Sequence, residues 1–104
     1  LKLSKFGGLS ALRRARDLCL HLEIMMVIED TWGSDIATAA ALHLAAATPL
    51  ETVLNVCDLS GYVAPRIDAS VPTRDGAWIG VPEGPGLGVS PDEAAIGAPV
   101  AVFS

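Results

Sequence analysis

Three short apolar stretches within the first 60 residues each end in charged side chains. Lys2 and Lys5 come first, the acidic pair Glu29-Asp30 comes second, and Asp58 comes third. One cationic and two anionic groups would suit a ligand that carries both a carboxylate and an ammonium group. The alternative is that these are ordinary polar residues of surface loops, and residue types alone do not separate the two interpretations.

The pattern of apolar residues predicts the order strand, helix, strand, helix, strand. Such alternation with short connections is typical of parallel strands joined by right-handed crossovers. Ligands of such folds bind at the carboxyl ends of the strands, where the three charged groups are expected. The predicted elements are a strand end over residues 1–4, a turn at Gly7-Gly8, a helix from Ser10 to about Leu22, a strand over 23–28, a helix from Ser34 or Asp35 to about Ala47, and a strand over 53–57.

The chain changes character after Gly61, because most of the prolines and glycines lie beyond it. We therefore expect two parts, a βαβαβ unit over residues 1–61 and an irregular segment over 62–104. Within the second part a short strand is expected around residues 77–81. A last helical turn is expected over 91–95, with Ser90 as its cap and a proline at its first position.

Composition limits the class of protein. The 104 residues correspond to about one small domain, and 51% hydrophobic against 18% charged residues favours a packed chain. A net charge of -5 argues against a nucleic-acid partner, and no apolar run is long enough for a membrane span. Cys19 and Cys57 show no metal or redox spacing and are interpreted as reduced thiols of a cytoplasmic protein. The opening Leu1 already has the pattern of a strand interior, which we interpret as a cut edge.

Three motifs carry a resemblance to a known family. They are Lys-x-x-x-x-Gly-Gly-Leu over residues 2–9, Gly-Ser-x-Ile-x-x-Ala-Ala-x-x-His-Leu-Ala-Ala over 33–46, and Val-Pro-x-Gly-Pro-Gly-Leu-Gly-Val over 81–89. In this order and spacing they resemble the enolase superfamily, and within it the mandelate racemase and muconate-lactonising enzyme group. The stretch Ile-Glu-Asp-Thr-Trp-Gly-Ser-Asp-Ile over 28–36 is most similar to the hydroxyproline dehydratases and epimerases.

This resemblance implies an α/β fold that forms the C-terminal portion, about strands six to eight, of a (β/α)8-type enolase barrel. Residues 1–61 would be the partial barrel, and residues 62–104 would return toward the capping domain. The implied partners are the rest of the barrel and the capping domain of a homo-oligomeric parent enzyme. The implied cofactor is Mg²⁺, with its carboxylate ligands on strands that this chain lacks.

The resemblance also implies roles for four residues. Lys2 would be one of two acid/base groups that act on the carbon next to a carboxylate, and nearby positive charge would favour its neutral form. Asp30 would bind the ammonium or ring nitrogen of an amino-acid substrate, and Asp58 would be a second substrate contact. Trp32 would offer an aromatic face to a cationic ring, or else pack beneath its loop. Racemisation, epimerisation and dehydration all remain open outcomes.

Two functions of different class follow. The first is a piece of a Mg²⁺-dependent racemase, epimerase or dehydratase, inactive until it is joined to the rest. The second is a non-catalytic α/β binding or scaffold module. The open strand edges of the isolated piece favour aggregation or oligomerisation, so a monodisperse monomer would count for the second interpretation.

Overall fold

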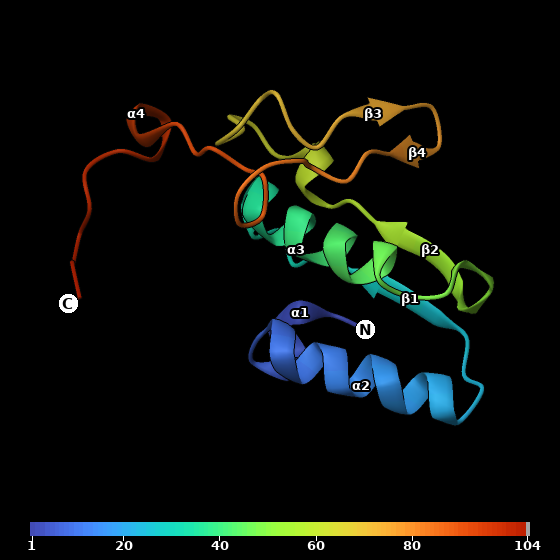
Figure 1. Cartoon of the computed structure of the whole chain (residues 1–104). Coiled ribbons are helices and arrows are strands. Elements are labelled where there is room, and N and C mark those ends of the chain that lie inside the picture. Colours follow the sequence, from blue (N-terminus) through green and yellow to red (C-terminus); the bar gives the residue numbers. More distant parts are fainter. Residues whose placement is uncertain (104) are drawn as a thin grey trace.

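The computed structural model describes residues 1–103, in which helices alternate with short strands (Figure 1). No helix in this range is long and apolar enough to cross a membrane. The elements in chain order are α1 (Leu3–Phe6), α2 (Leu9–His21), β1 (Met26–Glu29), α3 (Ser34–Ala46), the 3-10 turn η1 (Leu50–Thr52), β2 (Val53–Cys57), the 3-10 turn η2 (Ser60–Tyr62), β3 (Arg74–Asp75), β4 (Trp78–Ile79) and α4 (Glu93–Ile96).

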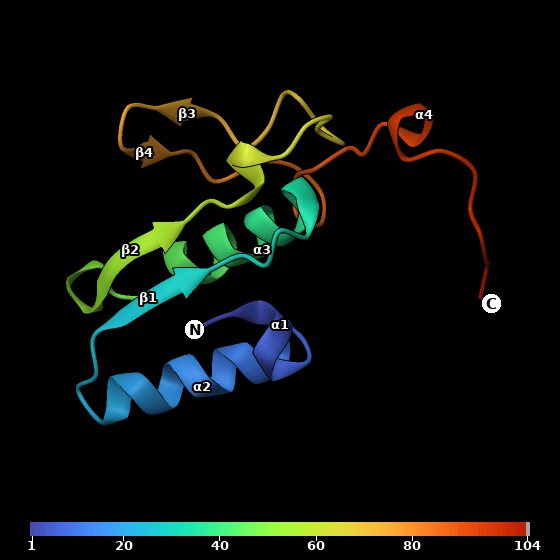
Figure 2. The ribbon, with the colours of Figure 1, turned by 180° about the vertical axis from the view of Figure 1, so that it is seen from behind.

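Three parallel segments form the centre of the fold. β1 pairs in parallel with β2, and Glu29 lies opposite Cys57. On the other side of β1, Lys2 forms a single parallel bridge with Glu29. α3 covers one face of this small sheet, and Figure 2 shows the opposite face with no element of the described chain across it. The parallel order predicted from the sequence is therefore present, with one face of the sheet open.

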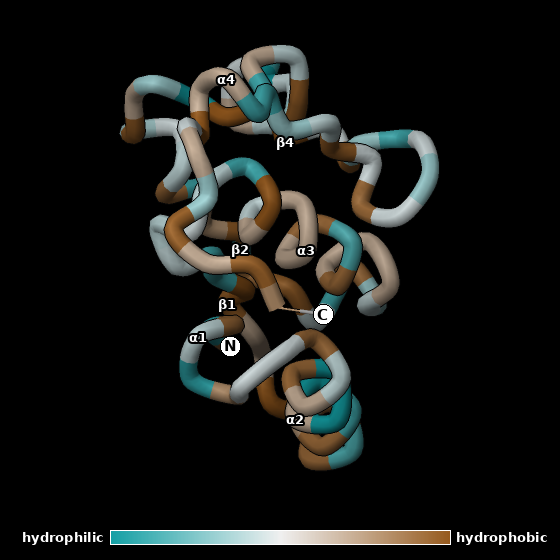
Figure 3. Tube along the Cα trace, turned by 90° about the vertical axis from the view of Figure 1, so that its left-hand side faces the viewer, coloured by the Kyte–Doolittle hydropathy of each residue, from teal (hydrophilic) through white to brown (hydrophobic). Residues whose placement is uncertain are grey.

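The core lies between the sheet and the two long helices. Its buried centre is formed by Leu12 of α2, Ile28 of β1, and Ala41 and Leu44 of α3. Figure 3 shows both hydrophobic and hydrophilic residues along α2, as expected for a helix with one buried side. Successive side chains of a strand point to opposite faces. Because Ile28 faces the helices, Glu29 faces the open side of the sheet.

The first predicted strand is wrong beyond Lys2. The chain turns there into the single-turn helix α1, which ends at Gly7 with a left-handed φ of 73°. Glycine is favoured at such a position because it has no Cβ. α2 then starts at Leu9 after Gly8, without a side-chain cap, so the capping role predicted for Ser10 is also wrong.

The second predicted strand begins later than expected. α2 is followed by a turn in which the Ile24 N–H donates to the Cys19 carbonyl oxygen at 2.9 Å. β1 therefore covers Met26–Glu29 rather than residues 23–28. The strand also ends one residue later than predicted, so that it includes Glu29.

The second part of the chain packs against α3 through loops. β3 and β4 form a short antiparallel hairpin, with β4 inside the strand predicted over residues 77–81. The glycine-rich stretch contacts α3, where His43 Nε2 lies 3.2 Å from the Leu87 carbonyl oxygen. The predicted final helix is shifted to Glu93–Ile96, because the Asp92 carboxylate, rather than Ser90, accepts the Ala94 N–H at 2.9 Å. Beyond α4 the chain runs away from the other elements (Figure 1).

A buried arginine joins the two long helices. Arg16 of α2 donates from Nη1 to the Ala47 carbonyl oxygen at 2.6 Å and to Thr48 Oγ1 at 3.2 Å. The last carbonyl groups of a helix lack partners within it, and a cation at this end is favourable. Arg16 thus caps α3 and fixes α2 against it.

We predict that Arg16→Met destabilises the chain by about 1–3 kcal/mol, since the Ala47 carbonyl loses a charged donor. Urea unfolding followed by circular dichroism measures the change. Arg14→Met is the matched control, because Arg14 lies exposed on the same helix. Equal stability of the two variants would contradict the capping role.

Candidate functional site

Lys2 lies at the carboxyl end of the first parallel segment and contacts Glu29. Its Nζ is 3.3 Å from Glu29 Oε2, and the two side chains are 32% and 37% exposed. The same two residues pair through their backbones. The ammonium group is therefore held at the edge of the sheet by a carboxylate of the neighbouring strand.

Lys2, Glu29 and Cys57 form a row across the three parallel segments. Residues opposite one another on neighbouring strands project from the same face, here the open face. Burial raises the pKa of the Cys57 thiol, and the negative charges of Glu29 and Asp30 raise it further. The thiol is therefore neutral near pH 7, and the ion pair of the row is the one between Lys2 and Glu29.

Asp30 points to the other face, toward the helices. It is fully buried, and its Oδ2 accepts hydrogen bonds from the Thr38 hydroxyl at 2.5 Å and from the N–H groups of Leu59 and Ser60 at 3.0 and 3.2 Å. These donors come from α3 and from the chain that follows β2. The contacts give Asp30 a role in holding the loops, and its predicted contact with substrate stays a prediction.

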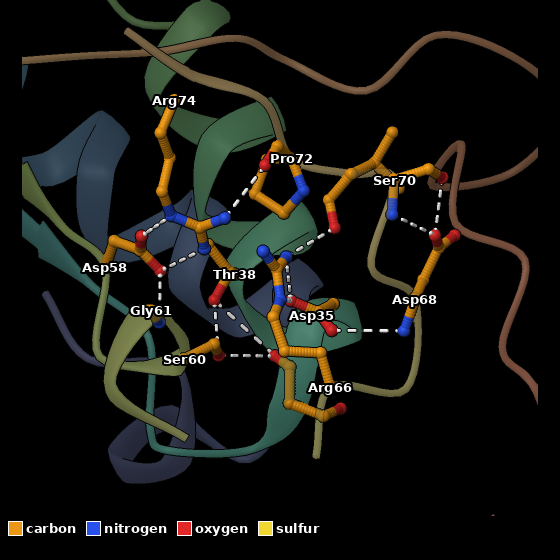
Figure 4. A network of polar contacts seen from close by, with 12 residues as sticks. Asp35, Thr38, Asp58, Ser60, Gly61, Arg66, Asp68, Ser70, Pro72 and Arg74 are labelled. Atoms are coloured by element: carbon orange, nitrogen blue, oxygen red, sulfur yellow. Dashed lines mark hydrogen bonds and ion pairs between the residues drawn. The ribbon is translucent and has the colours of Figure 1, made fainter. Parts of the chain in front are cut away.

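Asp58 is held by an arginine from the hairpin, as Figure 4 shows. Its carboxylate accepts from both Nε and Nη2 of Arg74, the latter at 2.9 Å, and from the Gly61 N–H at 3.0 Å. Burial alone would raise the pKa of Asp58, but the hydrogen bonds and the charge of Arg74 together lower it. The pair borders a hollow of about 480 Å³, whose lining includes Asn55, Cys57, Asp58, Tyr62, Arg74 and Ile79.

Two aromatic rings lie near the same ends of the strands. Trp32 follows β1 and Tyr62 closes η2, and their ring centroids are 6.3 Å apart at an interplanar angle of 45°. Trp32 is 56% exposed and Tyr62 is 82% exposed, so Trp32 does not pack beneath its loop. Trp32 and Ser34 both have positive φ, at 60° and 71°. Such backbone strain in non-glycine residues concentrates at ligand-binding loops.

The described residues do not form a magnesium centre. No group of three or more His, Cys, Asp or Glu side chains within residues 1–103 is placed to hold a metal. Mg²⁺ requires several oxygen ligands in octahedral geometry. The carboxylates nearest the strand ends are instead occupied by donors of the chain itself, namely Glu29 by Lys2, Asp30 by donors from α3 and from the chain after β2, and Asp58 by Arg74.

Comparison with known proteins defines the class of this fold. The family model for enolase C-terminal domain-like proteins matches residues 1–95. A cis-3-hydroxy-L-proline dehydratase from Roseibium aggregatum is 43% identical over 104 residues, which is 100% of this chain and 28% of that protein. The crystal structure of a mandelate racemase/muconate lactonizing enzyme from Roseovarius nubinhibens ISM is 44% identical, with a TM-score of 0.89, over 97% of this chain and 27% of that one.

A second Roseovarius nubinhibens ISM structure, complexed with magnesium, is 32% identical with a TM-score of 0.91, over 100% of this chain and 28% of that one. The fold is thus a portion of a (β/α)8-type enolase barrel, as the sequence predicted. The chain belongs to the enolase C-terminal domain-like family, in the mandelate racemase and muconate-lactonising enzyme group of the enolase superfamily. It spans a little over a quarter of the length of the relatives it matches.

Sequence reasoning named Glu29 as a charged residue at a strand end but gave neither Glu29 nor Cys57 a role, although both share a row with Lys2. It selected Asp30 and Asp58, each one position further along, whose carboxylates bind donors from α3 and β3. The alternation of faces along a strand could have indicated Glu29, because the apolar Ile28 marks the buried face. Cys57 required the pairing register, which the sequence does not contain.

We predict that Asp30→Ala destabilises the chain by about 3 kcal/mol or more, because several buried donors would lose their acceptor. Asp30→Asn should cost less, since the amide oxygen can still accept. Urea unfolding of both variants measures this. A loss of ligand affinity with unchanged stability would instead support the substrate contact.

The pKa of Asp58 predicts how stability depends on pH. Because the folded-state pKa is lowered, the Asp58–Arg74 pair stabilises the fold fully above the unfolded value of about 3.9 and is lost as pH falls through the folded pKa. Asp58→Asn should cost about 1–2 kcal/mol at pH 7 and progressively less below pH 4. Asp75→Asn, at an exposed position of the same hairpin, is the control. A cost for Asp58→Asn that does not change with pH would contradict the assignment.

Proposed function

We propose that this chain supplies the Lys2 side of a proton-transfer site that acts on the carbon next to the carboxylate of an amino acid, with proline derivatives as the substrate class. The observation that carries the proposal is the position of Lys2. It lies at the carboxyl end of a parallel segment, on the open face, within a chain 43% identical to a cis-3-hydroxy-L-proline dehydratase.

The chemistry of such a site requires a basic nitrogen that reaches the substrate carbon. An amine takes the proton, and an ammonium ion returns one. In this proposal Lys2 acts on one side of the carbon, and a second group outside residues 1–103 acts on the other. The metal that stabilises the developing negative charge in this family would also be held outside these residues.

Substrate recognition is proposed for residues around the same strand ends. Trp32, with Tyr62 beside it, offers exposed aromatic surface to a cationic ring. Asp58, which Arg74 holds in place, borders the hollow beside β2 and would be a second substrate contact. Asp30 accepts hydrogen bonds from Leu59 and Ser60 and would affect substrate binding by holding the chain after β2 in place.

The test is a chimera in which these 104 residues replace the matching segment of the Roseibium aggregatum relative. We expect the chimera to remove the α-proton of cis-3-hydroxy-L-proline, measured in D₂O by proton NMR as loss of its signal through exchange or dehydration, and to lose this activity when EDTA removes the metal. Lys2→Met should lower the exchange rate at least about a hundredfold. Lys5→Met is the matched control, since Lys5 is the only other lysine and lies exposed in α1.

An active chimera in which Lys2→Met exchanges as fast as the unsubstituted protein would refute the role of Lys2. A folded chimera that binds the ligand but leaves its α-proton in place would favour the second function, a non-catalytic binding module. The isolated 104-residue chain should show no exchange in either case.

A further inference from the structure

Glu29 is the carboxylate that contacts Lys2, with Oε2 at 3.3 Å from Nζ. It lies on the open face of the sheet, one position after the buried Ile28. The backbone bridge between Lys2 and Glu29 fixes the start of both side chains. The ion pair therefore has to order only the side-chain torsions, whereas a pair between two free loops must order backbone torsions as well.

The other groups near Lys2 do not compete for its charge. Cys57, the third member of the row, is neutral near pH 7 because burial and adjacent carboxylates raise its pKa. The Asp30 carboxylate faces the helices and accepts hydrogen bonds from α3 and from the chain after β2. Among residues 1–103, Glu29 is the one ion-pair partner of Lys2.

We infer that Glu29 is a positioning residue that holds the Lys2 nitrogen over the open face, where Lys2 transfers a proton to or from the α-carbon of the substrate. This inference rests on the proposed function. In the step, the C–H bond at the α-carbon breaks, its electron pair stays on the substrate as the enediolate, and the proton forms an N–H bond with the neutral amine of Lys2. In the reverse direction an N–H bond of Lys2 breaks and the C–H bond forms again.

Amine acylation tests the pair in the 104-residue chain itself. An acetyl N-hydroxysuccinimide ester reacts with free amines, and tandem mass spectrometry compares acetylation of Lys2 with that of Lys5, the only other lysine. We expect Glu29→Gln to raise the Lys2 to Lys5 ratio about threefold, the size of effect typical of a partly exposed ion pair. Glu29→Asp should give an intermediate ratio, because it keeps the charge on a shorter side chain.

Glu51→Gln is the matched control, since Glu51 is exposed in η1, and its ratio should equal that of the unsubstituted chain. Salt at about 1 M should raise the ratio of the unsubstituted chain toward that of Glu29→Gln. Urea should make all ratios equal, which establishes that the difference belongs to the folded chain. Equal ratios for the unsubstituted chain and Glu29→Gln without urea would overturn the inference.

Turnover in the chimera separates this inference from the proposed function. Glu29→Gln should lower kcat about ten- to hundredfold with little change in KM, because a misplaced proton-transfer group affects the reaction more than binding. Glu29→Asp should restore part of the rate. Unchanged kcat in Glu29→Gln, with Lys2→Met inactive, would overturn the role of Glu29 and leave that of Lys2 intact. Unchanged kcat in Lys2→Met would refute both.

Discussion

The carboxylate of Asp30 is the interaction on which the arrangement of the strand ends depends. One oxygen atom accepts hydrogen bonds from α3 and from the two residues that precede and begin η2. A buried carboxylate is stable only when its acceptor sites are filled, so each of these segments must keep its place for the others to be stable. The ends of β1 and β2 are thereby fixed, and with them the row of Lys2, Glu29 and Cys57 on the opposite face.

The same principle orders the second part of the chain, where regular elements are few. Asp35 at the start of α3 accepts from Arg66 Nε at 3.0 Å and from the Asp68 N–H at 3.2 Å. Asp68 in turn accepts from the N–H groups of Ser70 at 3.0 Å and Ser90 at 2.8 Å. Figure 4 shows the contact between Asp35 and Arg66 beside the pair of Asp58 and Arg74. The carboxylates of Asp35 and Asp68 thus accept hydrogen bonds from backbone N–H groups that have no strand partner. These contacts hold the segment that is rich in proline and glycine against the start of α3.

The sequence was sufficient for the order of the elements, because hydrophobic period and turn residues are local properties. The family motif that begins at Lys2 spans only residues 2–9, so it too could be recognised from the sequence alone. The α1 turn was not predictable from Leu3–Phe6, since its stability depends on the left-handed Gly7 and on packing of Leu3 against the core. The different environments of Glu29 and Asp30 were also not predictable from the sequence. Asp30 is buried and Glu29 is part-exposed in an ion pair with Lys2, and this difference arises only once the helices cover one face of the sheet.

The open face of the sheet connects the stability of the fold with its chemistry. Parallel sheets are normally covered on both faces, and here helices cover one face while Lys2 and Glu29 lie on the other. Any element that covers this face also removes water from the ion pair. The attraction between two unit charges grows as the effective dielectric constant falls, so covering the face strengthens the Coulomb attraction between Glu29 and Lys2. The same closure would exclude water from the proposed proton transfer at Lys2. The surface that the fold leaves uncovered is therefore the surface on which the proposed chemistry depends.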